Sequence, residues 1–234
     1  MAEENRARLK EIQQSLSDGD IEAASAATIN LILDAGVNGF GPVKSAKTVA
    51  EEALKHAGND RDKAVKKVIA THTRVVGASG FVSGLGGLAT MVVAIPADVT
   101  VLYTRATRMI AAIAHIQGYD VDSEEVRSVI AVSLIGSAGV EAMSKAGVEI
   151  GTKTALSALK KVPGSALTKI NKAVGFRLVT KFGTKGTINL VKVVPVAGGA
   201  VGGTINVAAI RSIAGYAKRN FPTIDQVDAP AAVL

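Results

Sequence analysis

The amino-acid sequence predicts an all-α protein, a compact multi-helix domain with glycine-rich, close-packed central helices. Nearly half of the residues are apolar, but only 3% are aromatic and none is tryptophan. Because β-sandwiches are usually richer in aromatic side chains, this composition favours helices that pack closely on one another. Apolar residues also recur at helical spacing in most segments, and 234 residues are enough for a real hydrophobic core.

Four helices are expected in the first third of the chain, separated by residues that favour turns. They span residues 3–17, 21–35, 42–56 and 61–76. Pro42 is expected to open the third helix, because proline is tolerated at the first helical position. Gly58 ends that helix, and Asn59 or Asp60 can cap the fourth.

The middle of the chain predicts two further helices. Apolar side chains recur at spacings of four and three through residues 99–117, and Gly118 ends this helix. Asp122 and Glu125 fit a capping box, so the next helix is expected to begin near Ser123. Gly136 and Gly139 are expected to interrupt or loosen that helix.

Beyond residue 150 the pattern is less regular. Residues 152–161 predict a basic helix that ends at Pro163. The structure of residues 165–192 stays open at this level, and a short strand at residues 188–194 is one option.

Two long uncharged runs, residues 75–97 and 193–210, stand out. The first has 23 residues and five glycines, and the second has two glycine pairs at four-residue spacing. Glycines four residues apart share one helix face and leave a flat groove for another helix backbone, so we expect the two runs to pack on each other. The residues of this helix-packing motif are Gly80, Gly84, Gly198, Gly199, Gly202, Gly203 and Asn206.

Three explanations of these runs stay open: a crowded helix crossing in a soluble core, insertion into a membrane, or chance spacing in a chain with 24 glycines. A helix of 23 uncharged residues is long enough to span a hydrocarbon core, but glycine makes the run only marginally hydrophobic. We therefore favour a close-packed domain that can meet a membrane over a spanning anchor.

Charge is distributed unevenly along the chain. Residues 152–234 carry 12 Lys/Arg and two acidic residues, whereas residues 1–151 carry 15 Lys/Arg and 18 acidic residues. A one-signed segment indicates an anionic partner, either lipid headgroups or a phosphate backbone, unless it is only a solvated face that keeps the protein soluble. The candidate lipid- or anion-binding residues of this segment are Lys160, Lys161, Lys169, Lys172, Arg177, Lys181, Lys185 and Arg211.

A second candidate site lies on the helix expected at residues 99–117 and just before it. Asp98, Arg105, Arg108 and His115 follow one helical stripe, opposite an apolar stripe. Three explanations stay open: the stripe is a ridge that binds headgroups or anions, Asp98 and Arg105 form a buried pair that locks the helix to its neighbours, or the stripe is an ordinary solvated face. Asp98, Arg105 and Arg108 join the lipid- or anion-binding candidates.

No catalytic or metal-binding constellation stands out. The three histidines lack the spacing of metal ligands, and a chain without cysteine has no thiolate chemistry. Residues 84–89 formally resemble a dinucleotide loop, but no strand precedes them and no acidic residue follows about 20 residues on. We expect no enzymatic activity, no cofactor and no metal, with an enzyme as a third alternative. Nucleic acid is not expected as a partner, because the basic segment lacks an RNP-like or helix-turn-helix pattern.

Three motifs in order resemble the EcsC protein family of bacteria. They comprise residues 80–87 and 95–98, then Arg105, residues 108–110, 113–114 and 118–120, and finally residues 194–206, Arg211 and residues 217–221. The resemblance covers roughly residues 70–221. It implies a helical fold and a bacterial, membrane-linked context, and it supplies no catalytic residues. The positions that transfer as a motif are Pro96, Asp98, Arg105, Gly198, Gly202 and Asn206.

These observations predict a non-enzymatic, membrane-associated or lipid-binding helical protein whose basic C-terminal third contacts anionic headgroups. The alternative is a soluble protein–protein interaction module that docks on a partner or forms a homo-oligomer through glycine-rich helix faces. We expect an N-terminal helical extension at residues 1–69, an EcsC-like helical domain at residues 70–221 and a loose tail at residues 222–234. The first residues lack a secretory-signal pattern, which favours a cytoplasmic location, peripheral to the inner membrane.

Overall fold

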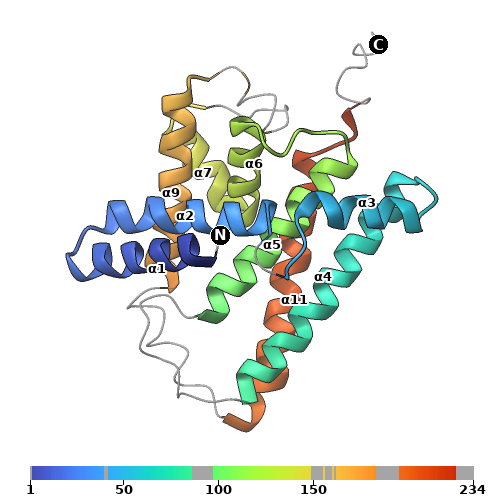
Figure 1. The fold of residues 1–234 in the computed structure, drawn as a ribbon, viewed down its shortest axis with the longest axis horizontal. Helices are drawn as coiled ribbons and strands as arrows, with labels where there is room; N and C mark the ends of the chain where they lie inside the picture. Colours follow the sequence, from blue (N-terminus) through green and yellow to red (C-terminus); the bar gives the residue numbers. More distant parts are fainter. Residues whose placement is uncertain are drawn as a thin grey trace.

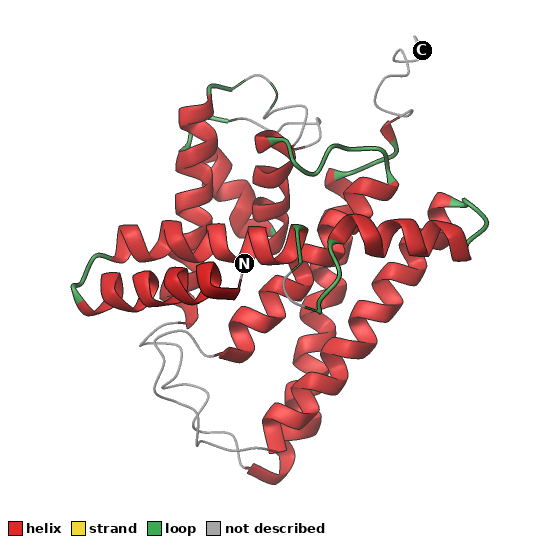
Figure 2. Cartoon of the chain, viewed as in Figure 1, coloured by secondary structure: helices red, strands yellow, loops and turns green. Residues whose placement is uncertain are grey.

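The chain folds into α-helices joined by short loops, as a computed structural model shows (Figures 1 and 2). The structure describes residues 2–39, 42–85, 97–148, 155, 160, 162–182 and 195–224. Its helices are α1 (Ala2–Ser17), α2 (Ile21–Val37), α3 (Ala46–His56), α4 (Arg61–Leu85), α5 (Ala97–Ile116), α6 (Glu124–Leu134), α7 (Ser137–Lys145), α9 (Gly164–Phe182) and α11 (Pro195–Asn220). No β-strand lies in this part of the chain, so the predicted all-α class is confirmed.

Side-chain caps fix where several helices begin. The backbone N–H of Lys63 donates to the Asp60 carboxylate over 2.9 Å, which confirms Asp60 as a cap of α4. The expected opening of α3 at Pro42 is wrong. The helix begins at Ala46, because Ser45 Oγ accepts a hydrogen bond from the backbone N–H of Thr48 over 3.1 Å.

The start of α6 was predicted to within one residue, but its capping residue was not. Ser123 is the cap, and its hydroxyl accepts from the backbone N–H of Val126. Asp122 instead forms an ion pair with Lys47 over 2.6 Å, which ties the α5–α6 loop to α3. The expected interruption after α6 is confirmed, since Gly136 has a φ of 60° between α6 and α7.

Helix α5 is the central element of the fold. Helices α2, α3, α4, α6 and α11 all pack on it. Met109, Ile110 and Ile113 are fully buried, and burial of each such side chain stabilises the fold by about 2 kcal/mol. The last turns of α5 are therefore buried on nearly every side rather than along one stripe.

The longest helices, α4 and α11, form the most extensive helix–helix contact among the described elements. They run antiparallel, and the end of the pair that holds Leu85 and Pro195 projects beyond the other helices (Figure 1). Helix α4 continues without a break past Val76, through the glycines that follow it. None of the helices, in the part of the chain that the structure describes, has the length and apolar character needed to cross a membrane.

Helix α9 packs against α2 on the opposite side of the molecule (Figure 1). The two backbones approach so closely that a Cβ added to Gly175 would lie 2.2 Å from the Ser25 carbonyl oxygen. Asp34 of α2 also pairs with Arg8 of α1 and Arg127 of α6. The boundary expected at residue 69 stays a prediction, although α2 and α3 both contact α5 directly.

Candidate functional site

The positive charge of the protein is concentrated on α4 and α11. Together these helices carry eight Lys/Arg and one Asp, a balance of +7. The whole chain also has a formal net charge of +7, so its remaining residues are balanced. The two helices lie more than 100 residues apart in sequence, and their pairing in the fold is what makes one strongly cationic element.

Charge is also separated along the length of this pair. Every Lys and Arg of α4 lies between Arg61 and Arg74, and those of α11 lie between Arg211 and Arg219. The projecting end contains residues 75–85 of α4 and 195–210 of α11, none of which is charged. At 1.5 Å per residue these segments are about 16 Å and 24 Å long. The pair therefore has a cationic base and an uncharged end.

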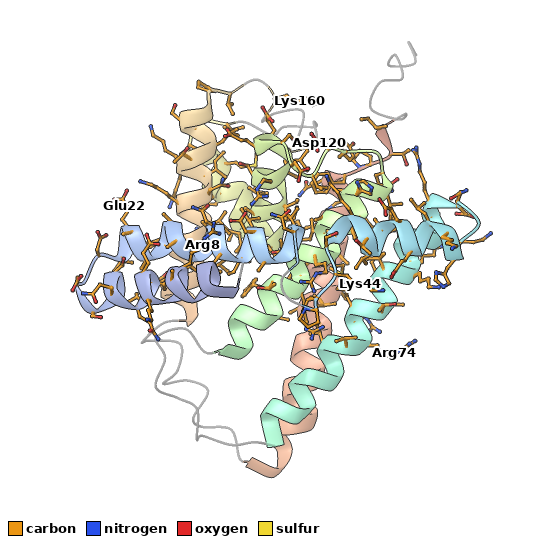
Figure 3. The ribbon with its side chains drawn as sticks, in the orientation of Figure 1. Arg8, Glu22, Lys44, Arg74, Asp120 and Lys160 are labelled. Atoms are coloured by element: carbon orange, nitrogen blue, oxygen red, sulfur yellow. The ribbon has the colours of Figure 1, made fainter. Side chains whose placement is uncertain are left out.

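A shallow groove of about 600 Å³ marks the junction between these two parts, on the face that α4 shares with α11. Lys66, Arg74 and Arg211 line it, and none of them forms an ion pair with any described residue. Arg74 projects away from the body of the molecule (Figure 3). Ile69 and Val207 form part of an apolar floor between the cations.

A second cationic site lies on the other face of α4, in a cavity of about 360 Å³ between α3, α4 and α5. Its charged and titratable lining residues are Lys44, Glu52, His56, Lys67, His72, Arg105 and Arg108. The only carboxylate among them, on Glu52, accepts a hydrogen bond from Lys44 Nζ over 2.5 Å. Lys67, Arg105 and Arg108 therefore have no carboxylate partner among the lining residues that the structure describes.

Arg108 is the most constrained of these cations. Its side chain is only 6% exposed, and one guanidinium N–H donates to the Ala35 carbonyl oxygen over 3.1 Å. Its Nε is buried without a hydrogen-bond partner among the described residues. Burial, and to a lesser extent the neighbouring charge of Arg105, lowers the pKa of Arg108. A buried guanidinium without a counter-charge is costly, which makes an external anion its natural complement.

His72 lies beside the two arginines. Its Nδ1 is 2.9 Å from the Val68 carbonyl oxygen, which can only accept, so Nδ1 carries a proton. Burial is the main cause that lowers the pKa of His72; the hydrogen bond to Val68 raises it, and the charges of Arg108 and Arg105 lower it further. The imidazole is therefore neutral at pH 7. Sequence reasoning did not assign His72 to a site, because it shares a helix face with apolar residues.

The predicted polar stripe of α5 is only partly described. Arg108 is buried, so an ordinary solvated face is the wrong interpretation at this position. Arg105 and His115 are half-buried. The side chain of Asp98 lies outside the described residues, and the Asp98–Arg105 pair stays untested. Of the sequence candidates, the structure brings Arg105 and Arg108 together in one cavity.

The basic residues of α9 have a different environment. Lys172 pairs with Glu22 of α2 over 2.6 Å, and Arg177 pairs with Glu141 of α7. Lys169 is exposed without an ion pair to a described residue. Acidic residues from the first two thirds of the chain thus balance part of the segment that looked one-signed in the sequence.

The other candidates are described less completely. Lys160 is exposed in a turn (Figure 3), whereas Lys161 and Lys185 lie outside the described residues. Lys181 lies on α9 and Asn206 on α11, and for both only the backbone is described. The helix expected at residues 152–161 and the strand option at residues 188–194 also fall largely or wholly outside the description.

The glycine motif has its backbone on α4 and α11. Ala70 and Arg74 of α4 line the same groove as Arg211 and Val207 of α11. Because the helices are antiparallel, Ala70 lies level with Arg211 and Arg74 with Val207. Two turns further along the pair, Gly80 of α4 is expected to lie level with residues near Gly202 of α11. The two helices pair as predicted, and direct glycine-to-glycine contact stays a prediction.

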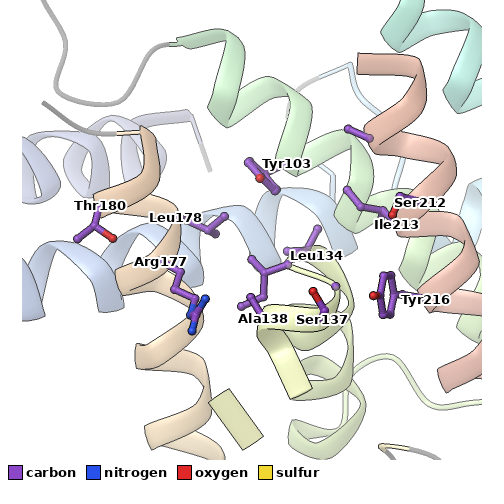
Figure 4. Close-up of a pocket in the computed structure, with 13 residues that line it drawn as sticks. Tyr103, Leu134, Ser137, Ala138, Arg177, Leu178, Thr180, Ser212, Ile213 and Tyr216 are labelled. Atoms are coloured by element: carbon purple, nitrogen blue, oxygen red, sulfur yellow. The ribbon is translucent and has the colours of Figure 1, made fainter. Parts of the chain in front are cut away.

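A further cavity of about 510 Å³ lies between α5, α7, α9 and α11 (Figure 4). Hydroxyl groups of Tyr103, Ser137, Ser212 and Tyr216 share its lining with aliphatic side chains, and burial raises the pKa of Tyr103 to about 12. Among the described lining residues, Arg177 is the only cation, and it is already paired with Glu141 outside the cavity. The described part of this lining therefore has no unbalanced charge.

Comparison with known proteins gives a single informative result. No curated protein and no solved structure matches the chain. The EcsC protein family matches over residues 25–223, a stretch that includes α3 to α11 in full and most of α2. It contains both cationic sites and extends beyond the span of residues 70–221 on which the sequence motifs lie. The chain belongs to the EcsC protein family.

Proposed function

We propose that this chain is a non-enzymatic, membrane-associated protein that binds anionic lipid headgroups. It would act from the cytoplasm, at the periphery of the inner membrane. The observation that carries the proposal is the separation of charge along α4 and α11, a cationic base next to an uncharged projecting end. Elements that lie in a membrane interface combine an apolar part with Lys and Arg in the same way.

The dimensions favour partial insertion. The uncharged part of α4 is about 16 Å long, whereas a bilayer core is about 30 Å thick. The projecting end would therefore reach into one leaflet. At that depth the groove cations Lys66, Arg74 and Arg211 would meet the headgroups, where each contributes about 1 kcal/mol.

This proposal moves the principal contact away from the C-terminal third as a whole. Lys172 and Arg177 already have acidic partners within the protein, so they are weaker candidates for headgroup contact. Arg211 belongs both to the basic C-terminal third and to the α4–α11 groove, so it is a headgroup candidate in either case. Lys169 and Lys160 also remain available for contact with headgroups. In the alternative, a soluble interaction module, the same α4–α11 surface would contact a protein partner. Vesicle flotation distinguishes this alternative from lipid binding.

Flotation with vesicles tests the proposal. Wild-type protein is expected to float with vesicles that contain anionic lipid and to stay at the bottom with neutral vesicles. The K66Q/R74Q/R211Q variant is expected to lose about a hundredfold in partitioning, which corresponds to about 3 kcal/mol. The matched control, K10Q/K55Q/K145Q, removes three exposed lysines that are not headgroup candidates and should float almost as well as wild type.

Each other outcome has a defined meaning. Equal loss in both variants would show that net charge matters rather than the α4–α11 element. Equal recovery of the wild-type protein with neutral and anionic vesicles would show that Lys and Arg do not contact anionic headgroups. Absence of the wild-type protein from both kinds of vesicle would reject membrane association and favour the soluble interaction module.

A further inference from the structure

We infer that the cavity between α3, α4 and α5 binds a phosphate-type anion, either free or as the phosphomonoester headgroup of a lipid. Arg105 and Arg108 are the residues that would hold it. This inference does not rest on membrane binding, because the cavity lies on the other face of α4 from the groove that is proposed to meet the vesicle surface.

The charge of the cavity is unbalanced. Four Lys/Arg line it against one carboxylate, and that carboxylate is occupied by Lys44. Neither Arg105 nor Arg108 has an ion pair with any residue whose side chain the structure describes. Two neighbouring guanidinium groups without an acid repel each other, and the repulsion is strongest where water is excluded. A bound anion would remove it.

Arg108 is buried with part of its hydrogen-bonding capacity unused. Its side chain is more than nine-tenths buried, lines the cavity and keeps one N–H donor, on Nε, without a partner in the described part of the chain. A buried donor without an acceptor costs about 1 to 3 kcal/mol, more for a charged group. Phosphate oxygens match the fork of donors on arginine, so a phosphate would satisfy both the charge and the geometry.

The size of the cavity and its access from solvent suit a small anion. A cavity of about 360 Å³ is at the lower end of the range for small-molecule sites, which suits a phosphate or a phosphomonoester better than a large ligand. Lys67 is exposed and Arg105 is half-buried, so the cations form a path from solvent to the buried Arg108. Val75, which is 37% exposed, adds an apolar edge at the side nearest the uncharged end of α4.

Binding of an anion at this site is linked to protonation of the His72 imidazole. The charged and titratable groups around it are Lys67 of α4, Glu52 and His56 of α3, Arg105 and Arg108 of α5, and Lys44 of the preceding loop. With Nδ1 donating to Val68, a second proton on Nε2 would give the imidazole a donor for the anion. Phosphate binding is therefore expected to raise the pKa of His72 and to take up protons near neutral pH.

Thermal unfolding with defined anions tests the inference. Inorganic phosphate, and dihexanoyl phosphatidic acid below its micelle concentration, are each compared with sodium chloride at equal ionic strength. Both phosphate compounds are expected to raise the melting temperature of the full chain, because a ligand that binds only the folded state stabilises it. Stabilisation by the lipid alone would identify a headgroup site, and stabilisation by both would identify a site that also takes free phosphate.

Variants separate this site from the vesicle-binding groove. Arg105→Gln and Arg108→Gln are each expected to weaken phosphate binding roughly tenfold to a hundredfold. Arg108→Gln should also leave the ligand-free protein as stable as wild type or more so, since it removes a buried uncompensated charge. Arg74→Gln, on the opposite face of α4, should weaken vesicle flotation and leave phosphate binding unchanged.

The histidine ring signals give an independent measurement. The chain has only three histidines, so nuclear magnetic resonance can follow His72 separately from His56 and His115. Phosphate should raise the pKa of His72 alone. Equal stabilisation by phosphate and chloride, undiminished phosphate binding in both arginine variants, or an unchanged His72 pKa in the presence of phosphate would each overturn the inference.

Discussion

Two basic regions of this protein look alike in the sequence and differ in the fold. The α9 region has several cations and no acid nearby along the chain, yet Lys172 and Arg177 pair with Glu22 and Glu141. The α4–α11 pair contains a single acidic residue, Asp62, and Lys66, Arg74 and Arg211 stay without an ion pair to any residue whose side chain is described. A count of charge along the chain therefore does not locate charge in space. The structure separates cations that hold helices together from cations that remain available for an external anion.

The largest expected effect is on stability and belongs to α9. Gly175→Val should destabilise the protein by about 3 kcal/mol, because its Cβ would overlap the Ser25 carbonyl oxygen of α2. Gly164→Ala is the matched control at the start of α9, where an added Cβ meets only a distant carboxylate oxygen of Glu124. Urea unfolding measures both variants. Equal stability of the two would show that the α2–α9 contact is looser than described.

The second expected effect is the salt dependence of vesicle binding, which tests whether the cations of the α4–α11 pair make the contact. Raising the ionic strength from about 0.1 M to about 0.5 M should weaken binding of wild-type protein to anionic vesicles at least tenfold, since exposed charges are screened. The K66Q/R74Q/R211Q variant should be nearly insensitive to salt. A salt dependence of wild-type strength in that variant would place the electrostatic contact on other residues, such as those of α9.

A smaller effect is expected from the ion pairs of α9. Arg177→Gln and Glu141→Gln should each cost at most about 1 kcal/mol, and a double-mutant cycle should give a coupling energy in the same range, because the pair is largely solvent-exposed. Neither variant should weaken vesicle binding by more than a few-fold. A loss as large as that of the groove variant would mean that Arg177 leaves its partner to contact lipid.

Part of this organisation was predictable from the sequence. Local signals such as Gly58, Gly118 and Asp60 fixed helix ends, because turns and caps depend on neighbouring residues. Uncharged runs with matching glycine spacing predicted that α4 and α11 pair. The candidate site was predicted less well. Lys172 and Glu22 are 150 positions apart, and no local pattern indicates that they meet.

The burial of Arg108 was not predictable for a related reason. An amphipathic pattern places polar residues toward solvent, but α5 is surrounded by other helices and has no solvated face at this position. The one signal available for the groove was the absence of acidic residues between Lys63 and Ala97 and throughout α11. That signal becomes informative only once the two helices are known to be neighbours.

The smallest expected effect concerns pH. The folded-state pKa of His72 lies below its ordinary value of 6.5 because the ring is buried, so the unfolded chain binds the proton more readily. His72 should therefore leave stability unchanged well above pH 6.5 and reduce it as the pH falls below that value. Unfolding of wild type and His72→Gln between pH 5 and pH 8 measures this, and the variant should show the shallower decline. Added phosphate should reduce the difference between them.

The most direct test of the central claim uses the absence of tryptophan from the chain. A single tryptophan is introduced at Leu85, on the uncharged end of α4, or at Phe176, which is 51% exposed on α9. Anionic vesicles with brominated lipid tails then report contact with the hydrocarbon region by quenching of fluorescence. If the projecting end inserts into the bilayer, Leu85→Trp shows strong quenching and a blue shift, and Phe176→Trp shows neither. Quenching at Phe176→Trp without quenching at Leu85→Trp would contradict insertion of the projecting end.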